Sequence, residues 1–205
     1  MKKLILLINF VSIFGLMYSQ DQIITEKSHG KNEIGIYSRI GICELTRHQE
    51  QQGIVSAHGK EVLQYGLSYI RTISKDVKLE TGVFYSRYTI VNHIIDEPDL
   101  HFYATEYMHL ISIPILLRYY FQGNIYVSGG TTLDLVSSRT GGWVLTDSQN
   151  GFSLSIGAGK EIYVHRFSVY FEPNFILHAV VPFSGNLIQQ KFFVSGIKLG
   201  INYNI

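Results

Sequence analysis

Charged side chains recur on one face of the strands predicted for this 205-residue chain, and most of their neighbours on that face are small. The candidates for a charge network inside the fold are Arg39, Glu172, Lys198, Glu80 and Arg118. A buried charge is tolerated only when it is paired and hydrogen-bonded, because its desolvation is costly. These residues therefore predict either a structural network that fills the interior or a gated path for protons or ions.

Histidines offer a second kind of chemistry, because the 8 in the chain could act as metal ligands or as general bases. Those that fall in predicted loops are His48, His58, His93 and His101. No pair has the HxxxH or HxH spacing that brings two ligands to one metal ion. We therefore expect no metal site and no cofactor.

A catalytic site of the hydrolase kind needs a base beside a nucleophile. His109 and Ser195 belong to predicted strands on opposite sides of the fold. His178 and Asp134 belong to two strands that a third strand separates, so we expect them not to touch. The sequence thus predicts no catalytic triad, and we do not expect an enzyme.

The elements that carry these residues are strands, because apolar residues alternate with small or polar ones at a period of two. The alternation predicts strands near 33–44, 61–73, 77–90, 107–121, 125–137, 151–162, 167–179 and 191–205. Each reaches the roughly 9–11 residues that a tilted membrane strand needs. We expect an all-β fold, an eight-stranded antiparallel up-and-down transmembrane β-barrel.

The connections between the predicted strands alternate between short and long. Tight turns are expected at 74–76, 122–124 and 163–166, and longer, mostly polar links at 45–60, 91–106, 138–150 and 180–190. Outer-membrane barrels have this arrangement, with short periplasmic turns and long external loops. A barrel of eight strands has an interior that side chains just fill, so we expect no general porin, although a narrow ion or solute channel stays open as an alternative.

The non-apolar stripe decides between a membrane barrel and a soluble, lipocalin-like ligand-binding barrel. A stripe that faced water would be dense in charged residues, whereas this one is rich in glycine and serine. Small residues suit a crowded lumen, which leaves the apolar stripe to face lipid. The membrane barrel is therefore favoured, with lipid of the cell outer membrane as its surroundings.

The domain organisation follows from the first residues and from the bulk composition. Residues 1–19 resemble a secretory signal peptide, 20–31 form a short N-terminal segment, and 32–205 form one barrel domain. A formal net charge of +1 gives no electrostatic case for binding nucleic acid. Cys43 is the single cysteine, so no intrachain disulfide can form. We expect the barrel to be a monomer.

Function is expected in the external loops, where a rigid scaffold can present a contact surface. The predicted link 91–106 is the best candidate, because apolar residues in a loop often mark such a surface. Its candidate contact residues are Ile94, Ile95, Leu100, Phe102 and Tyr103. Packing of these residues over the barrel mouth is the alternative.

The fourth and fifth predicted strands carry a resemblance to a known family. Residues 113–121, IPILLRYYF, are followed by a tight turn and then by YVSGG at 126–130. This pattern resembles the PorT-like outer-membrane β-barrel family, and the layout of strands and turns matches over about 32–205. The resemblance implies an eight-stranded barrel of a Gram-negative outer membrane. It carries no specific activity to this chain, although the founding member is associated with protein secretion.

Overall fold

The computed structural model describes residues 32–46, 55–97, 100–141, 146–184 and 190–205, and at 55–56, 94–97 and 100–101 it describes the backbone alone. The predicted signal peptide, 1–19, and the segment 20–31 lie outside the described residues.

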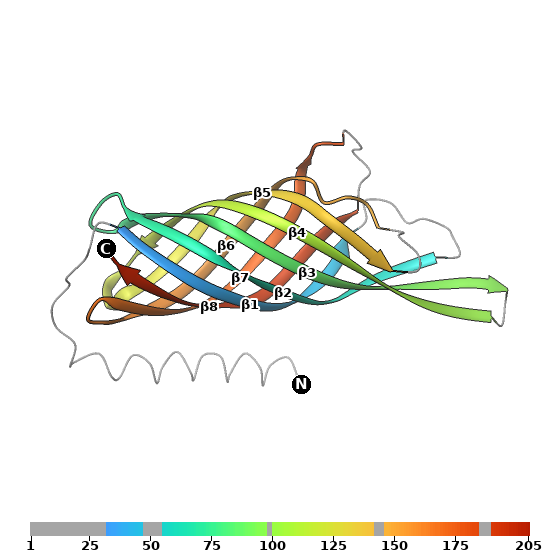
Figure 1. Cartoon of the computed structure of the whole chain (residues 1–205), viewed down its shortest axis with the longest axis horizontal. Helices are drawn as coiled ribbons and strands as arrows, with labels where there is room; N and C mark the ends of the chain where they lie inside the picture. The colour runs from blue at the N-terminus through green and yellow to red at the C-terminus, as the bar shows by residue number, and fades with distance from the viewer. Residues whose placement is uncertain (1–31, 47–54, 98–99, 142–145, 185–189) are drawn as a thin grey trace.

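Eight antiparallel strands close into one barrel, because β1 pairs with both β2 and β8 (Figure 1). Their bounds are β1 Asn32–Thr46, β2 Val55–Thr72, β3 Val77–Glu97, β4 Leu100–Tyr120, β5 Ile125–Gly141, β6 Gly151–Val164, β7 Phe167–Pro182 and β8 Lys191–Asn204. A single turn of 3₁₀ helix, η1 (Gln122–Asn124), joins β4 to β5. The predicted fold class is confirmed, because sequential strands pair throughout and closure leaves no free sheet edge around the barrel wall.

The hairpin of β3 and β4 is longer than the sequence predicted. Each strand has 21 residues, and their pairing continues through Val91↔Thr105 to Glu97↔Leu100. The prediction of a loop at 91–106 is therefore wrong, because β3 and β4 stay paired with each other past the end of the β4–β5 pairing. Figure 1 shows this hairpin extending beyond the rest of the barrel at the end opposite the short turns.

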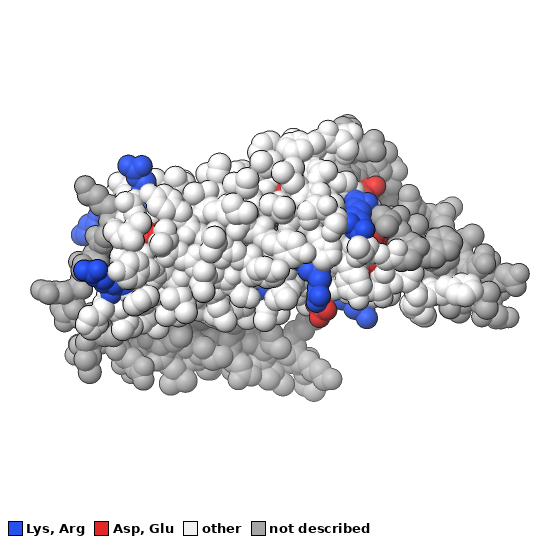
Figure 2. Space-filling model, viewed as in Figure 1, with Lys and Arg blue, Asp and Glu red and all other residues white. Residues whose placement is uncertain are grey.

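The outer surface of the barrel wall is apolar. Exposed side chains on it include Ile40 at 67%, Leu67 at 66% and Ile156 at 64% of their full accessible area. Lys, Arg, Asp and Glu are sparse over the middle of the face in Figure 2 and gather toward its two ends. Because an apolar band of this kind needs an apolar solvent, the wall faces lipid and the soluble lipocalin-like arrangement is excluded. No helix among the described residues is long and apolar enough to cross a membrane.

The interior is filled by polar and aromatic side chains that lie over inward-facing glycines. A Cβ atom added to Gly200 would lie 2.4 Å from the ring of Tyr170, and one added to Gly159 would lie 2.7 Å from the ring of Tyr126. Both rings are buried. The small residues of the inward stripe therefore make room for large residues on neighbouring strands, which is how so narrow a barrel fills its lumen.

Candidate functional site

The centre of the lumen holds an ion cluster organised around Glu80 of β3. Its carboxylate accepts hydrogen bonds from Arg118 Nε at 2.8 Å and from Lys198 Nζ at 2.6 Å. Arg118 comes from the neighbouring β4, whereas Lys198 comes from β8 and reaches Glu80 across the lumen. All three side chains have no exposed area. Two cations on one buried carboxylate tie opposite walls of the barrel together.

Glu172 of β7 extends this cluster toward the other side of the lumen. The register places it directly opposite Lys198, and its Oε2 lies 4.0 Å from Lys198 Nζ. The same carboxylate accepts hydrogen bonds from Tyr126 Oη at 2.7 Å and from Ser128 Oγ at 3.1 Å. Four of the five charged residues singled out from the sequence thus lie in one connected network.

Arg39 of β1 lies at the same level without joining that network. The register pairs it with Lys198, but its Nη1 donates a 2.5 Å hydrogen bond to Gln64 Oε1 on β2. Gln64 in turn donates to Ser86 Oγ at 2.7 Å. Among the described residues Arg39 forms no ion pair, so its partner is an amide and not a carboxylate of the predicted charge network.

A second ion cluster lies below the first, near the short turns, and the sequence reasoning missed its two carboxylates. Lys78 Nζ donates to Glu33 and to Tyr163 Oη, and lies 3.7 Å from Glu161 Oε2. Tyr120 Oη also donates to Glu161, at 2.5 Å. The signal was present, because Glu33 and Glu161 continue the inward stripe at the ends of β1 and β6.

The expectation that His178 and Asp134 do not touch is wrong. His178 Nδ1 lies 2.6 Å from Asp134 Oδ2, although β6 lies between their strands. The residue of β6 between them is Ser153, whose hydroxyl also donates to Asp134. Adjacency of strands is the wrong criterion inside a narrow barrel, because inward side chains from β5 and β7 can meet over a small residue.

At the other ring nitrogen of His178, Tyr88 Oη lies 2.8 Å from Nε2. The order carboxylate, imidazole, hydroxyl resembles that of a catalytic triad. All three side chains are buried, however, with Tyr88 at 1% exposure. The adjoining cavity, which Arg39 and Asp134 both line, is about large enough for one water molecule. The Tyr88 hydroxyl therefore lies within the packed lumen, away from the surface.

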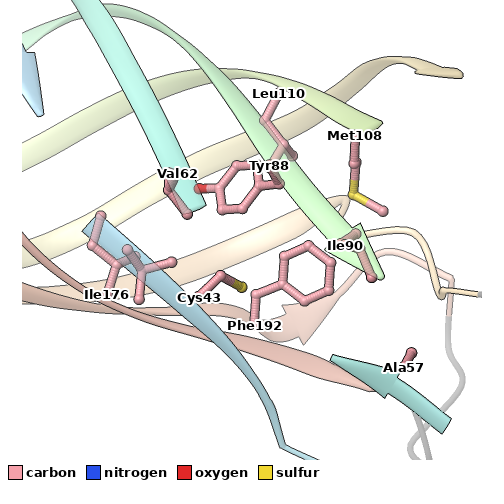
Figure 3. Close-up of a cluster of buried hydrophobic side chains, with 10 residues drawn as sticks. Cys43, Ala57, Val62, Tyr88, Ile90, Met108, Leu110, Ile176 and Phe192 are labelled. Carbon is pink, nitrogen blue, oxygen red and sulfur yellow. The ribbon is translucent and has the colours of Figure 1, made fainter. Parts of the chain in front are cut away.

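An apolar cluster closes the lumen above these polar groups. Its side chains come from six strands. Figure 3 shows them around Tyr88 and Phe192, whose ring centroids lie 5.5 Å apart. The cluster consists of Cys43, Ala57, Val62, Tyr88, Ile90, Met108, Leu110, Ile176, Phe192 and Val194. Along β3 and β4 the cluster lies between Ser112, which donates to Asp134, and the buried Asn92 and Glu106 nearer the outer mouth.

The outer mouth is covered by the segment that precedes β6. Thr146 Oγ1 donates a 2.7 Å hydrogen bond to Glu106 of β4, and Arg139 of β5 donates to the Thr146 carbonyl at 2.9 Å. Gln149 has no exposed area, and it donates to the Gln190 carbonyl at 2.8 Å and accepts from the Phe192 amide. These hydrogen bonds to other segments of the chain hold residues 146–150 across the end of the barrel.

The candidate contact surface at 91–106 lies on the projecting hairpin. Phe102 is 48% exposed and Tyr103 is 72% exposed, and the ring of Tyr103 stacks on His93 with centroids 4.7 Å apart. The backbone of Ile94, Ile95 and Leu100 belongs to β3 and β4, while their side chains lie outside the described residues. The alternative that these residues pack over the barrel mouth does not fit Phe102 and Tyr103, which remain exposed.

The other histidines of the predicted loops do not come together. His58 lies in β2 and His93 in β3, whereas His48 and the side chain of His101 lie outside the described residues. No group of three or more His, Cys, Asp or Glu side chains in the described part of the chain is placed to hold a metal ion. Cys43 is buried in the apolar cluster and unpaired.

Comparisons with known proteins support the fold and identify no family. No family model matches the sequence, and no curated protein matches it either. Among solved structures, the outer membrane protein OprG from Pseudomonas aeruginosa is 12% identical with a TM-score of 0.51, covering 85% of this chain and 96% of that one. Ail, the attachment invasion locus protein of Yersinia pestis, is 13% identical with a TM-score of 0.41, covering 85% of this chain and 99% of that one. The similarity to OprG shows that this chain has the fold of a small outer-membrane β-barrel.

Proposed function

We propose that this protein is an outer-membrane barrel with a filled lumen, and that it works by binding a protein partner through the projecting β3–β4 hairpin. It is neither a general porin nor an enzyme in this proposal. Membership of the PorT-like family is part of the proposal and rests on the strand pattern of residues 113–121 and 126–130.

The observation that carries the proposal is that the β3–β4 hairpin continues beyond the point where the pairing of β4 with β5 ends. Pairing of β4 with β5 ends at Glu106↔Gly141, whereas pairing of β4 with β3 continues to Glu97↔Leu100. The outward edge of residues 100–105 is therefore free of any strand partner among the described residues. An unpaired edge that carries exposed aromatic residues is a template for recognition of another chain.

A shortened hairpin tests this proposal directly. Asn92 and Ala104 are paired, so replacing residues 93–103 by Asn-Gly joins them through a two-residue hairpin turn. Membranes extracted in mild detergent should yield a complex from the wild type and the bare barrel from the shortened variant on native gels. The matched control is Lys75→Gln in the short β2–β3 turn, which should keep the complex. A complex of unchanged size from the shortened variant contradicts the proposal.

The narrow channel is a second candidate, favoured only by the cavity beside Arg39 and Asp134. The apolar cluster lies across the lumen above that cavity, so we expect no steady ion conductance in planar bilayers. A channel requires a conductance that changes in Arg39→Ala or Glu172→Ala. If the wild type shows such a conductance, the channel function is supported and the partner-binding proposal is contradicted.

A further inference from the structure

The outward face of β3 and β4 carries a polar group at the height where the apolar band ends. Arg87 lies 10 residues beyond Val77, the first residue of β3. With a rise of about 3.4 Å per residue and a tilt of about 40°, Arg87 lies roughly 25 Å above the short turns along the barrel axis. That is about the height of the apolar band of an outer-membrane barrel, so Arg87 lies at the outer membrane–water boundary.

The guanidinium of Arg87 lies on the outward face beside an aromatic ring. It lies 5.9 Å from the centroid of the Tyr107 ring, and among the residues that the structure describes it forms no hydrogen bond or ion pair. Its register partners are Leu63 on β2 and His109 on β4. Since no described residue pairs with it, the guanidinium fork of Arg87 is available to bind an anion from outside the protein.

His109, directly opposite Arg87, is held in a fixed orientation. Tyr85 Oη lies 2.6 Å from His109 Nδ1, and the two rings stack with centroids 5.6 Å apart. When the tyrosine hydroxyl donates to Nδ1, the other ring nitrogen, Nε2, carries the proton and has no partner among the described residues. Tyr65 extends the row on β2, with its ring 5.3 Å from Tyr85.

We propose that Arg87 and His109 bind the phosphate of an outer-leaflet lipid. A guanidinium fork matches phosphate oxygens, and an imidazole N–H can donate to the same group. The exposed Val83 and Ile111 lie below on the same face, where the acyl chains of that lipid run. Glu61, the one acidic residue of β2, accepts a hydrogen bond from Thr89 Oγ1 at 3.4 Å and forms no ion pair with Arg87. The inference rests on the proposed membrane location and not on the partner-binding hairpin.

The probe for this site is diphosphorylated lipid A, with chemically dephosphorylated lipid A as its matched counterpart. Binding to the full-length barrel in mixed detergent micelles is measured by native mass spectrometry. We expect the phosphorylated lipid to bind more tightly, and Arg87→Gln to weaken it about tenfold, the effect of losing a charge-assisted hydrogen bond. His109→Phe, which keeps an aromatic ring, should weaken it about threefold.

Matched controls separate the site from general charge attraction. Lys75→Gln removes one positive charge at the opposite end of the barrel and should leave the affinity unchanged. Heat-modifiable migration on gels checks that every variant is folded. Equal binding of the two lipids, or wild-type affinity in Arg87→Gln, overturns the proposal. Displacement of the lipid by an equal concentration of inorganic phosphate also overturns the lipid as occupant, since the acyl chains would then contribute nothing.

Discussion

The lumen and the projecting hairpin differ in the exposure of their polar and aromatic side chains, which are buried in the lumen and exposed on the hairpin. In the lumen Glu80, Arg118 and Lys198 have no exposed area, and each is paired. On the hairpin Tyr103 is 72% exposed and Phe102 is 48% exposed, beyond the end of the β4–β5 pairing. The packed charges of the lumen should therefore contribute to stability and the exposed hairpin residues should not, so substitutions in the two regions should have separable effects.

The largest effect is expected from Glu80→Leu. This substitution leaves Arg118 and Lys198 as two buried cations without their shared carboxylate, so it should lower the free energy of unfolding by about 3–5 kcal/mol. Urea titration of the barrel refolded in detergent micelles, followed by heat-modifiable migration, measures the change. The adjacent outward residue provides the control, Thr81→Ala, with an expected change within about 0.5 kcal/mol. Equal stabilities of the two variants would mean that the ion cluster does not hold the barrel together.

A smaller effect on the free energy of unfolding is expected where the lumen is held by close packing and not by ion pairs. In Gly200→Ala the new methyl group meets the buried ring of Tyr170, so the free energy of unfolding should fall by about 1–3 kcal/mol. In Gly129→Ala the new methyl group meets only the Ser155 carbonyl oxygen, at 3.8 Å, and the change should be below about 1 kcal/mol. The same urea titration compares the two variants. If Gly129→Ala is the more damaging, the packing account of the lumen is wrong.

Little or no change in stability is expected from a substitution in the projecting hairpin. Tyr103→Ser removes a side chain that is mostly exposed, so the free energy of unfolding should change by less than about 0.5 kcal/mol. The midpoint of urea unfolding should coincide with that of the wild type. A loss comparable to that of Gly200→Ala would place Tyr103 in the packed structure and remove the contrast between the two regions.

The strands of the barrel wall could be predicted from the sequence because the alternation with a period of two is a local signal. The register places Arg39 and Glu172 each opposite Lys198, all three of them candidates for the predicted charge network. Contacts across the lumen could not be predicted in the same way. The pairing of His178 with Asp134 depends on the width of the barrel and on the small Ser153 between them, neither of which follows from strand order.

The length of the β3–β4 hairpin was missed for a different reason. Residues 91–106 include polar residues that are typical of a loop, and the sequence reasoning gave them that assignment. The turn-forming residues DEPD at 96–99, with β-branched and aromatic residues on either side, were the signal for a tight hairpin. Loop composition was therefore a weaker guide than the position of the turn.

Site-specific photo-cross-linking in living cells tests the central claim most directly, namely that the hairpin is the surface that meets a protein partner. A photoreactive residue replaces Tyr103 on the hairpin or, for comparison, Lys75 in the short β2–β3 turn, and both positions are exposed. We predict a discrete protein adduct from position 103 that is absent from position 75. Failure to form any protein adduct at position 103, or the same adduct at both positions, would contradict the claim.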